Sequence, residues 1–166
     1  MKKLAILAVA GAAISTPALA APGNTDTATG AATAEVVAPI TITHTVGAVL
    51  DFGTFTAGTA AGTVTVDQAG VGSTTGDAVH VATSVESADA FTVSGDANRG
   101  FDIVAAGGTV AELGGATMAF TTDAPATGTL DGTGAASFTV GGTLSVAANQ
   151  TPGVYSGSYV VTATYN

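Results

Sequence analysis

Apolar and polar residues alternate most clearly along the end of the chain. In residues 155–166 the large apolar side chains fall mostly on one face, which carries Tyr155, Tyr159, Val161, Ala163 and Tyr165. Alternation with a period of two is typical of a half-buried β-strand. We therefore expect one long strand over residues 154–165 that runs to the chain end. No later residue covers its edge, and such an edge recruits other strands through its unpaired N–H and C=O groups.

Shorter alternating runs precede this strand, and stretches rich in Gly, Ser, Thr and Asp separate them. No run of useful length has the helical period after the first twenty residues. Many short strands with Gly-rich turns predict an all-β sandwich or barrel. The expected strands are residues 40–46, 49–55, 62–67, 78–82, 90–94, 100–104, 117–122 and 137–146, and the main expected turns are residues 69–76, 107–108, 114–115 and 124–128.

The alternation also extends in front of the first expected strand. Ala34, Val36 and Ala38 share a face with Ile40 and Ile42, but Pro39 cannot donate a hydrogen bond to a ladder and divides the run. Residues 21–32 contain no large apolar side chain and read as a flexible leader. The sequence thus predicts a leader with a candidate strand over residues 21–38 and a sandwich domain over residues 39–166.

The first twenty residues have the pattern of a signal peptide. Lys2 and Lys3 precede an apolar run over residues 4–14, and Ala18-Leu19-Ala20 forms a small-x-small cleavage site. The apolar run is too short to span a bilayer, and no later segment is long and apolar enough to do so. We expect cleavage after Ala20 and export through a bacterial-type inner membrane and the periplasm, to the cell surface or the medium.

Composition then narrows the classes of partner and chemistry. Loss of residues 1–20 leaves Arg99 as the only basic side chain against twelve Asp and Glu residues. This excludes nucleic acid, because phosphate binding needs clustered Lys and Arg, and it disfavours anionic membrane surfaces. The chain has no Cys, so disulfides and thiolate metal sites are excluded as well.

Candidate catalytic and metal-binding residues are few. We expect His44 on the face of Ile40 and Ile42 and His80 pointing outward, and neither has a nucleophile-elbow motif or a second ligand nearby. Asp96, Asn98 and Asp102 place oxygen atoms at alternate positions, as Ca²⁺ ligands do. However, the glycine comes one place early for an EF-hand loop and no Glu follows, so we interpret residues 96–102 as a polar turn in which Arg99 neutralises Asp96 or Asp102. The sequence predicts no enzyme, cofactor or metal.

Three segments carry a family resemblance. They are Leu50-Asp51-Phe52-Gly53, Val140-Gly141-Gly142-Thr143-Leu144, and the closing Gly-x-Tyr-Ser-Gly-x-Tyr-x-Val-Thr-x-x-Tyr-Asn of residues 153–166. Together they resemble secreted bacterial proteins of the domain of unknown function 4402 family, which look like relatives of spore coat protein U and of archaic chaperone–usher pilins.

The resemblance implies an immunoglobulin-like sandwich that lacks its last strand. In such pilins a periplasmic chaperone lends a strand to the open groove, and an outer-membrane usher exchanges it for the N-terminal extension of the next subunit. By position, the acceptor edge would include Tyr159, Val161, Ala163 and Tyr165. The donor would include Ala32, Ala34, Val36 and Ala38, most of which are small residues that bury little area.

Three hypotheses about function follow. The first is a structural subunit of a bacterial surface filament, assembled by donor-strand complementation between copies of this chain. The alternative is a self-contained secreted sandwich that acts as a surface, matrix or adhesive protein and whose residues 31–38 fold back into their own groove. The third is an enzyme or a carbohydrate-binding module, which the absence of Trp and the placement of all three Tyr in the last strand disfavour.

Overall fold

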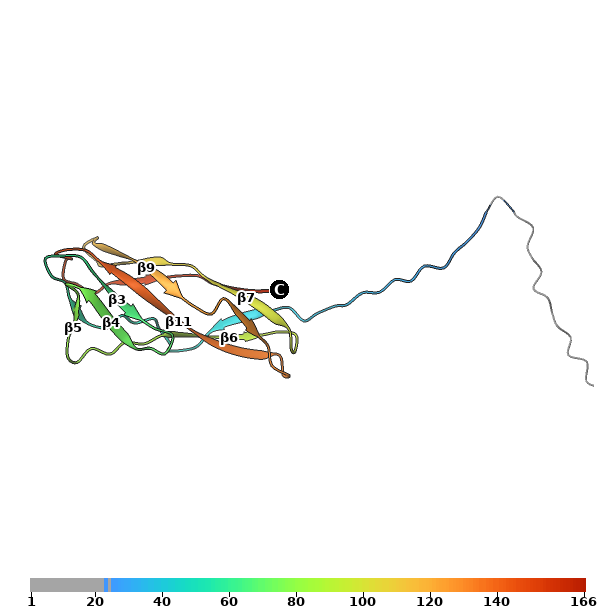
Figure 1. The fold of residues 1–166 in the computed structure, drawn as a ribbon, viewed down its shortest axis with the longest axis horizontal. Helices are drawn as coiled ribbons and strands as arrows, with labels where there is room; N and C mark the ends of the chain where they lie inside the picture. Colours follow the sequence, from blue (N-terminus) through green and yellow to red (C-terminus); the bar gives the residue numbers. More distant parts are fainter. Residues whose placement is uncertain (1–22, 24) are drawn as a thin grey trace, which may run out of the picture. The chain divides into compact units, whose positions relative to one another are not determined.

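The computed structural model describes Gly23 and residues 25–166, and every regular element in this part of the chain is a β-strand (Figure 1). The predicted all-β fold is therefore confirmed. The predicted signal peptide, residues 1–20, lies outside the described residues. Residues 25–35 contain neither helix nor strand and are exposed, and they form a unit apart from residues 36–166. Among the described residues no helix is long and apolar enough to cross a membrane.

The strands of the domain are short except for β11. They are β1 (Thr41–His44), β2 (Phe55–Thr56), β3 (Gly62–Val66), β4 (Gly72–Gly76), β5 (Val79–His80), β6 (Asp89–Ser94), β7 (Gly100–Ala105), β8 (Gly108–Ala111), β9 (Thr117–Asp123), β10 (Thr127–Thr129), β11 (Ala135–Val146), β12 (Ser156–Ser158) and β13 (Val161–Tyr165).

Strand β11 joins the two layers of the sandwich. Its first half pairs with β6, which in turn pairs with β1, and its second half pairs with both β3 and β9. Strands β7 and β8 follow each other closely and form the middle of the second layer, where β7 lies between β10 and β13 and β8 lies between β9 and β12. All these pairings are antiparallel.

Two glycines allow β3, β6 and β9 to pack closely against β11. Gly141 and Gly142 are buried at the point where β11 changes partners. A Cβ atom at Gly142 would lie 2.6 Å from the carbonyl oxygen of Thr121, and one at Gly141 would clash with the carbonyl oxygen of Val66. Glycine is thus needed here because neighbouring backbones approach closely.

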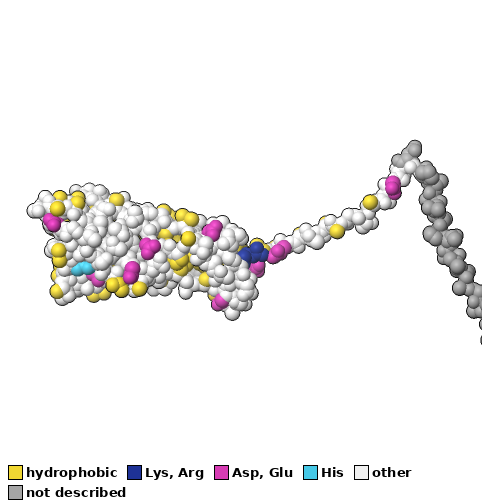
Figure 2. Space-filling view, viewed as in Figure 1, with side chains coloured by type: hydrophobic (Ala, Val, Ile, Leu, Met, Phe, Trp, Pro, Cys, Tyr) yellow, Lys and Arg dark blue, Asp and Glu magenta, His cyan; other side chains and the backbone are white. Residues whose placement is uncertain are grey.

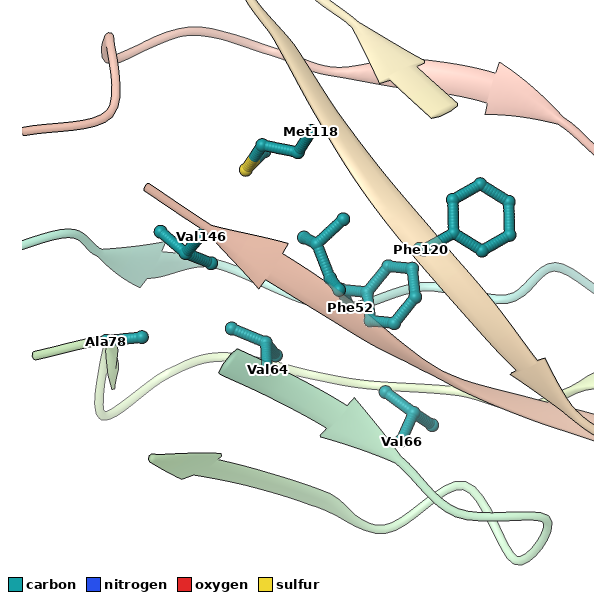
Figure 3. Packing of buried hydrophobic residues seen from close by; sticks show 8 residues of the cluster. Phe52, Val64, Val66, Ala78, Met118, Phe120 and Val146 are labelled. Carbon is teal, nitrogen blue, oxygen red and sulfur yellow. The ribbon is translucent and has the colours of Figure 1, made fainter. Parts of the chain in front are cut away.

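The core consists of two clusters that lie one after the other along the sandwich. Figure 3 shows part of the first cluster, in which side chains of β3 and β11 face Phe52, Met118 and Phe120. The second cluster contains Val93, Phe101, Ile103 and Leu130. Phe91 lies between the clusters, where its ring stacks on Phe138 at 5.6 Å and meets Tyr159 edge-on at 6.3 Å. The first cluster contains Phe52, Val64, Val66, Ala78, Met118, Phe120, Leu144 and Val146.

Several sequence-based expectations about individual strands were wrong. Strand β4 lies entirely within residues that we expected to be a turn, strand β10 lies there for its first two residues, and strand β8 was not expected and begins at the last residue of an expected turn. Strands β4 and β10 consist of Gly, Ser and Thr and lack the large apolar residues that mark a strand. Most of the expected strand 49–55 has no ladder, and only Asp51 forms an isolated bridge, to Ser87.

The expected long strand over residues 154–165 is divided. Strand β12 pairs with β8 and β13 pairs with β7, so the break at Tyr159–Val160 lies beside the break between β7 and β8. One backbone hydrogen bond still crosses this point, from the Ala106 N–H to the Val160 carbonyl oxygen at 2.9 Å. The predicted inner face survives the interruption, since Tyr155, Tyr159 and the apolar residues of β13 are all half-buried.

Candidate functional site

Two of the strands with a single ladder partner, β1 and β13, lie close to each other. Within the described residues β1 pairs with β6 alone, and β13 pairs with β7 alone. The inward side chains of both strands pack on the second core cluster, and Cα atoms of β1 and β13 approach within 8 Å. The seam between these two edges is here called the edge groove. It has residues 40–57 on one wall and residues 150–165 on the other, and it is open as a cavity between residues 49–57 and residues 150–157.

The edge groove is wide at one end. There it forms a cavity of about 800 Å³ between residues 49–57 and residues 150–157. Its floor consists of the apolar side chains of Val110, Met118, Phe120 and Leu144. Two of these floor residues, Met118 and Phe120, lie on β9 as Figure 3 shows. Apolar side chains therefore line the wide end, although neither wall has a ladder partner across it.

The other end of the groove is narrow. Ile40 and Ile42 on one wall and Val161 and Ala163 on the other pack on the same buried cluster. Tyr165 ties this end together, because its hydroxyl donates to the Ala38 carbonyl oxygen at 3.0 Å and accepts from the Asp96 N–H at 2.6 Å. This end, where Ala38 meets Tyr165, is here called the C-terminal end of the domain (Figure 1).

A buried carboxylate links the two walls between these ends. Asp89 is only 5% exposed. One oxygen, Oδ1, lies 2.6 Å from Nε2 of His44 and also accepts from the Ala90 N–H, while the other accepts from the Tyr159 hydroxyl at 2.8 Å. Burial raises the pKa of Tyr159 above its ordinary value, and the hydrogen bond to Asp89 and the charge of that carboxylate raise it further. Asp89 thus connects β1 to the residue that precedes β13.

Asp89 was not among the site residues predicted from the sequence. Its two side-chain partners are 45 and 70 positions away in the sequence, so no local motif marks it. Asp89 directly precedes the expected strand 90–94.

The residues predicted for the acceptor edge lie together along one wall of the groove. Tyr159 packs against the first core cluster, and Val161, Ala163 and Tyr165 pack against the second. The predicted donor residues Ala32, Ala34, Val36 and Ala38 form no strand and are exposed, with Val36 at 96%. The structure therefore places the acceptor residues in a groove and leaves the donor residues without a ladder.

The histidines contact carboxylates rather than nucleophiles. His44 is half exposed and its ring packs edge-on against Phe91 at 5.2 Å. The prediction that His80 points outward was wrong. Its side chain is 20% exposed and its Nε2 lies 3.5 Å from Oε1 of Glu86, whereas the neighbouring Val79 is 58% exposed. His80 sits beside Gly72, which leaves room for an imidazole that a larger residue would displace.

Residues 96–102, whose oxygen side chains are spaced as in a Ca²⁺-binding loop, form a turn with an internal ion pair. Nε of Arg99 lies 3.2 Å from Oδ2 of Asp96, while Asp102 accepts instead from the Asn166 amide at 3.5 Å. Among the described residues no three His, Asp or Glu side chains are grouped as metal ligands. On the face of the domain seen in Figure 2, the acidic side chains lie singly and form no continuous charged patch.

Comparison with known proteins gives one match. The family model described as Domain of unknown function (DUF4402) matches residues 40–165. The chain belongs to this family. The match covers both walls of the edge groove and all the strands β1 to β13, whereas the candidate donor residues precede it. No curated protein and no solved structure matches the chain. Membership of the DUF4402 family therefore agrees with the resemblance seen in the sequence but assigns no activity.

Proposed function

We propose that this protein is a structural subunit of a bacterial surface filament in which one copy donates a strand to the next. The observation that carries this proposal is the edge groove, an apolar groove between two strand edges that have no partner across it among the described residues. An added strand would pair its backbone with such an edge and bury alternate side chains between the walls. The partner is a second copy of the chain, with a periplasmic chaperone and an outer-membrane usher assisting export and assembly.

The direction of the chain distinguishes donation between copies from insertion into the same domain. The extension is the segment of residues 25–38, and Ala38 lies at the C-terminal end of the domain, because its carbonyl oxygen accepts from Tyr165, the last residue of β13. An extension that returned into its own groove would approach Ala38 in the direction of β13 and run antiparallel to β1. An extension from another copy is free to enter in the opposite direction, antiparallel to β13 and parallel to β1.

The extension forms no strand in the structure. Val36 is 96% exposed and residues 25–40 form no ladder. The self-contained sandwich is the alternative, and it needs residues 31–38 to form a ladder within their own domain.

A pair of substitutions on opposite faces of the extension tests the proposal. Ala34→Asp would place an unpaired charge in the apolar groove of the next copy, whereas Thr33→Asp would place the same charge on the outer face. Both residues are exposed outside the strands, so neither change disturbs the fold of the domain. We expect electron microscopy of surface preparations to show filaments for the wild type and Thr33→Asp and a strong loss for Ala34→Asp. Absence of wild-type filaments, or equal assembly by both variants, would contradict the proposal.

A further inference from the structure

The extension, residues 25–38, has the alternating pattern of a strand. This pattern begins well before Val36, the first large apolar residue of the extension. Between residues 25 and 35 the odd positions are Thr25, Thr27, Thr29, Ala31, Thr33 and Glu35, which are mostly polar. The even positions between 28 and 34 are Ala28, Gly30, Ala32 and Ala34, which are all small and without polar side chains. Val36 follows on the same face as the only larger apolar side chain, and Asp26, which precedes Ala28 on this face, ends the apolar run. This is the period-two pattern of a strand with one small apolar face.

The width of the edge groove varies along its length, as the size of the side chains does along the extension. Its wide end holds a cavity of about 800 Å³, and its other end is narrow enough for Cα atoms of β1 and β13 to approach within 8 Å. A strand placed between two edges needs about 10 Å between them, because neighbouring strands are about 4.8 Å apart. The narrow end must therefore open on insertion, and Ala and Gly side chains keep the required opening small.

Chain direction decides which part of the extension meets which end. An extension that runs antiparallel to β13 begins at the C-terminal end of the acceptor and finishes at its wide end. The last residues of the extension, and with them Val36, then reach the cavity between residues 49–57 and residues 150–157. The small residues before Val36 pass Tyr159, Val161 and Ala163.

We propose that residues 28–36 of one copy form a strand in the edge groove of the next copy, with Val36 beside Tyr155 in the wide end. In this register Ala32 lies opposite Tyr159, Gly30 opposite Val161 and Ala28 opposite Ala163. The alanine-rich sequence of the extension is thereby explained as a fit to a narrow groove, rather than as a weak anchor. This register rests on the proposed function and specifies the segment, its direction and its pairing.

The absence of native cysteine makes the register directly measurable by disulfide cross-linking. The register places Thr33 opposite Ser158 and Thr29 opposite Thr162, and all four side chains are exposed in the structure. The double variants Thr33→Cys/Ser158→Cys and Thr29→Cys/Thr162→Cys bring their Cα atoms into the range of a disulfide, about 4.4–6.8 Å. The crossed pairs, Thr33→Cys/Thr162→Cys and Thr29→Cys/Ser158→Cys, are displaced by about four residues, or roughly 13 Å, and serve as matched controls.

We expect non-reducing gels of oxidised surface preparations to show a ladder of covalent multimers for the two matched pairs and none for the crossed pairs. Filaments that form with cross-linking in the crossed pairs, or in none of the four, would overturn the register and leave the proposed function standing. Protein that remains monomeric without filaments, or that cross-links only within one chain, would overturn both.

Two substitutions that enlarge a side chain of the extension give a second, independent test. Ala32→Phe should reduce the number of filaments about tenfold or more, because the ring would overfill the groove beside Tyr159, where Asp89 links the two walls. Val36→Phe should leave assembly intact, because the cavity at the wide end accommodates the ring. Both residues are exposed in the unassembled domain, so its melting temperature should be unchanged in both variants. Equal loss or equal assembly in the two variants would contradict the register.

Discussion

At the scale of single residues, Asp89 carries the most consequential interaction. It is a buried carboxylate that receives hydrogen bonds from both walls of the edge groove, through His44 and Tyr159. A buried charge is tolerated only where donors compensate for the lost water, so the removal of one donor has a large cost. The sequence offers no local sign of this arrangement, since its members come from three distant segments.

Tyr159→Phe removes one of these donors and keeps the ring that packs on Phe91 and Phe120. We expect the free energy of unfolding to fall by about 1–3 kcal/mol, because Asp89 loses a partner while it stays buried. Tyr155→Phe is the matched control, since its hydroxyl donates to the exposed Thr151 carbonyl oxygen. Urea unfolding of both variants measures the difference, and equal losses would show that the Asp89 hydrogen bond has no special weight.

The raised pKa of Tyr159 also predicts a dependence of stability on pH. The folded protein holds this proton more tightly than the unfolded chain, whose tyrosine pKa is about 10. Its contribution is therefore fully present below pH 10 and is lost as the pH rises above that value. We expect the free energy of unfolding to decline more steeply between about pH 10 and pH 11 in the wild type than in Tyr159→Phe. Parallel declines in the two proteins would contradict this assignment.

At the scale of elements, alternation predicts a strand where large apolar residues carry it. Strands β3, β6, β7, β9 and β11 were predicted for this reason, and each places alternate side chains in a core cluster. Strand β4, with the sequence Gly-Ser-Thr-Thr-Gly, is a strand only because β3 lies beside it. Pairing of this kind is non-local and leaves no pattern in the strand's own sequence.

The difference between local alternation and non-local pairing also explains how much of the site could be predicted. The inner face of residues 155–165 was read correctly from its alternation, because burial repeats every second residue there. The break at Tyr159–Val160 was not predicted, because it follows from the break between β7 and β8 on the neighbouring strand. The width of the groove also depends on segments that are distant in sequence.

The glycines at which β11 changes partners give a prediction about the packing of this strand. Gly142→Ala places a Cβ atom 2.6 Å from the Thr121 carbonyl oxygen, so β9 and β11 must move apart. We expect a loss of about 1–3 kcal/mol in the free energy of unfolding, which is the usual cost of overpacking. Gly132→Ala, where nothing lies within 4 Å, is the control and should change stability by less than about 0.5 kcal/mol. A tolerated Gly142→Ala would show that β11 does not need glycine to change partners.

At the scale of the whole molecule, the domain presents a groove and the chain carries a segment of matching pattern outside it. The domain alone leaves the edges of β1 and β13 without partners, which is a hazard for an isolated sandwich. Under the proposed function, pairing between copies would remove this hazard and build a linear polymer, because each copy would contribute one groove and one extension. The free edges would then be the means of assembly.

Hydrogen exchange at the backbone amides of β13 tests this central claim most directly. Alternate amides of Val161–Tyr165 donate to β7 and should be protected in every state, whereas those that face the edge groove have no partner until a strand is added. The account predicts that these groove-facing amides exchange rapidly in the full-length monomer and become protected in filaments. Groove-facing amides that are already protected in a lone full-length monomer, or that stay unprotected in every form of the protein, would contradict it.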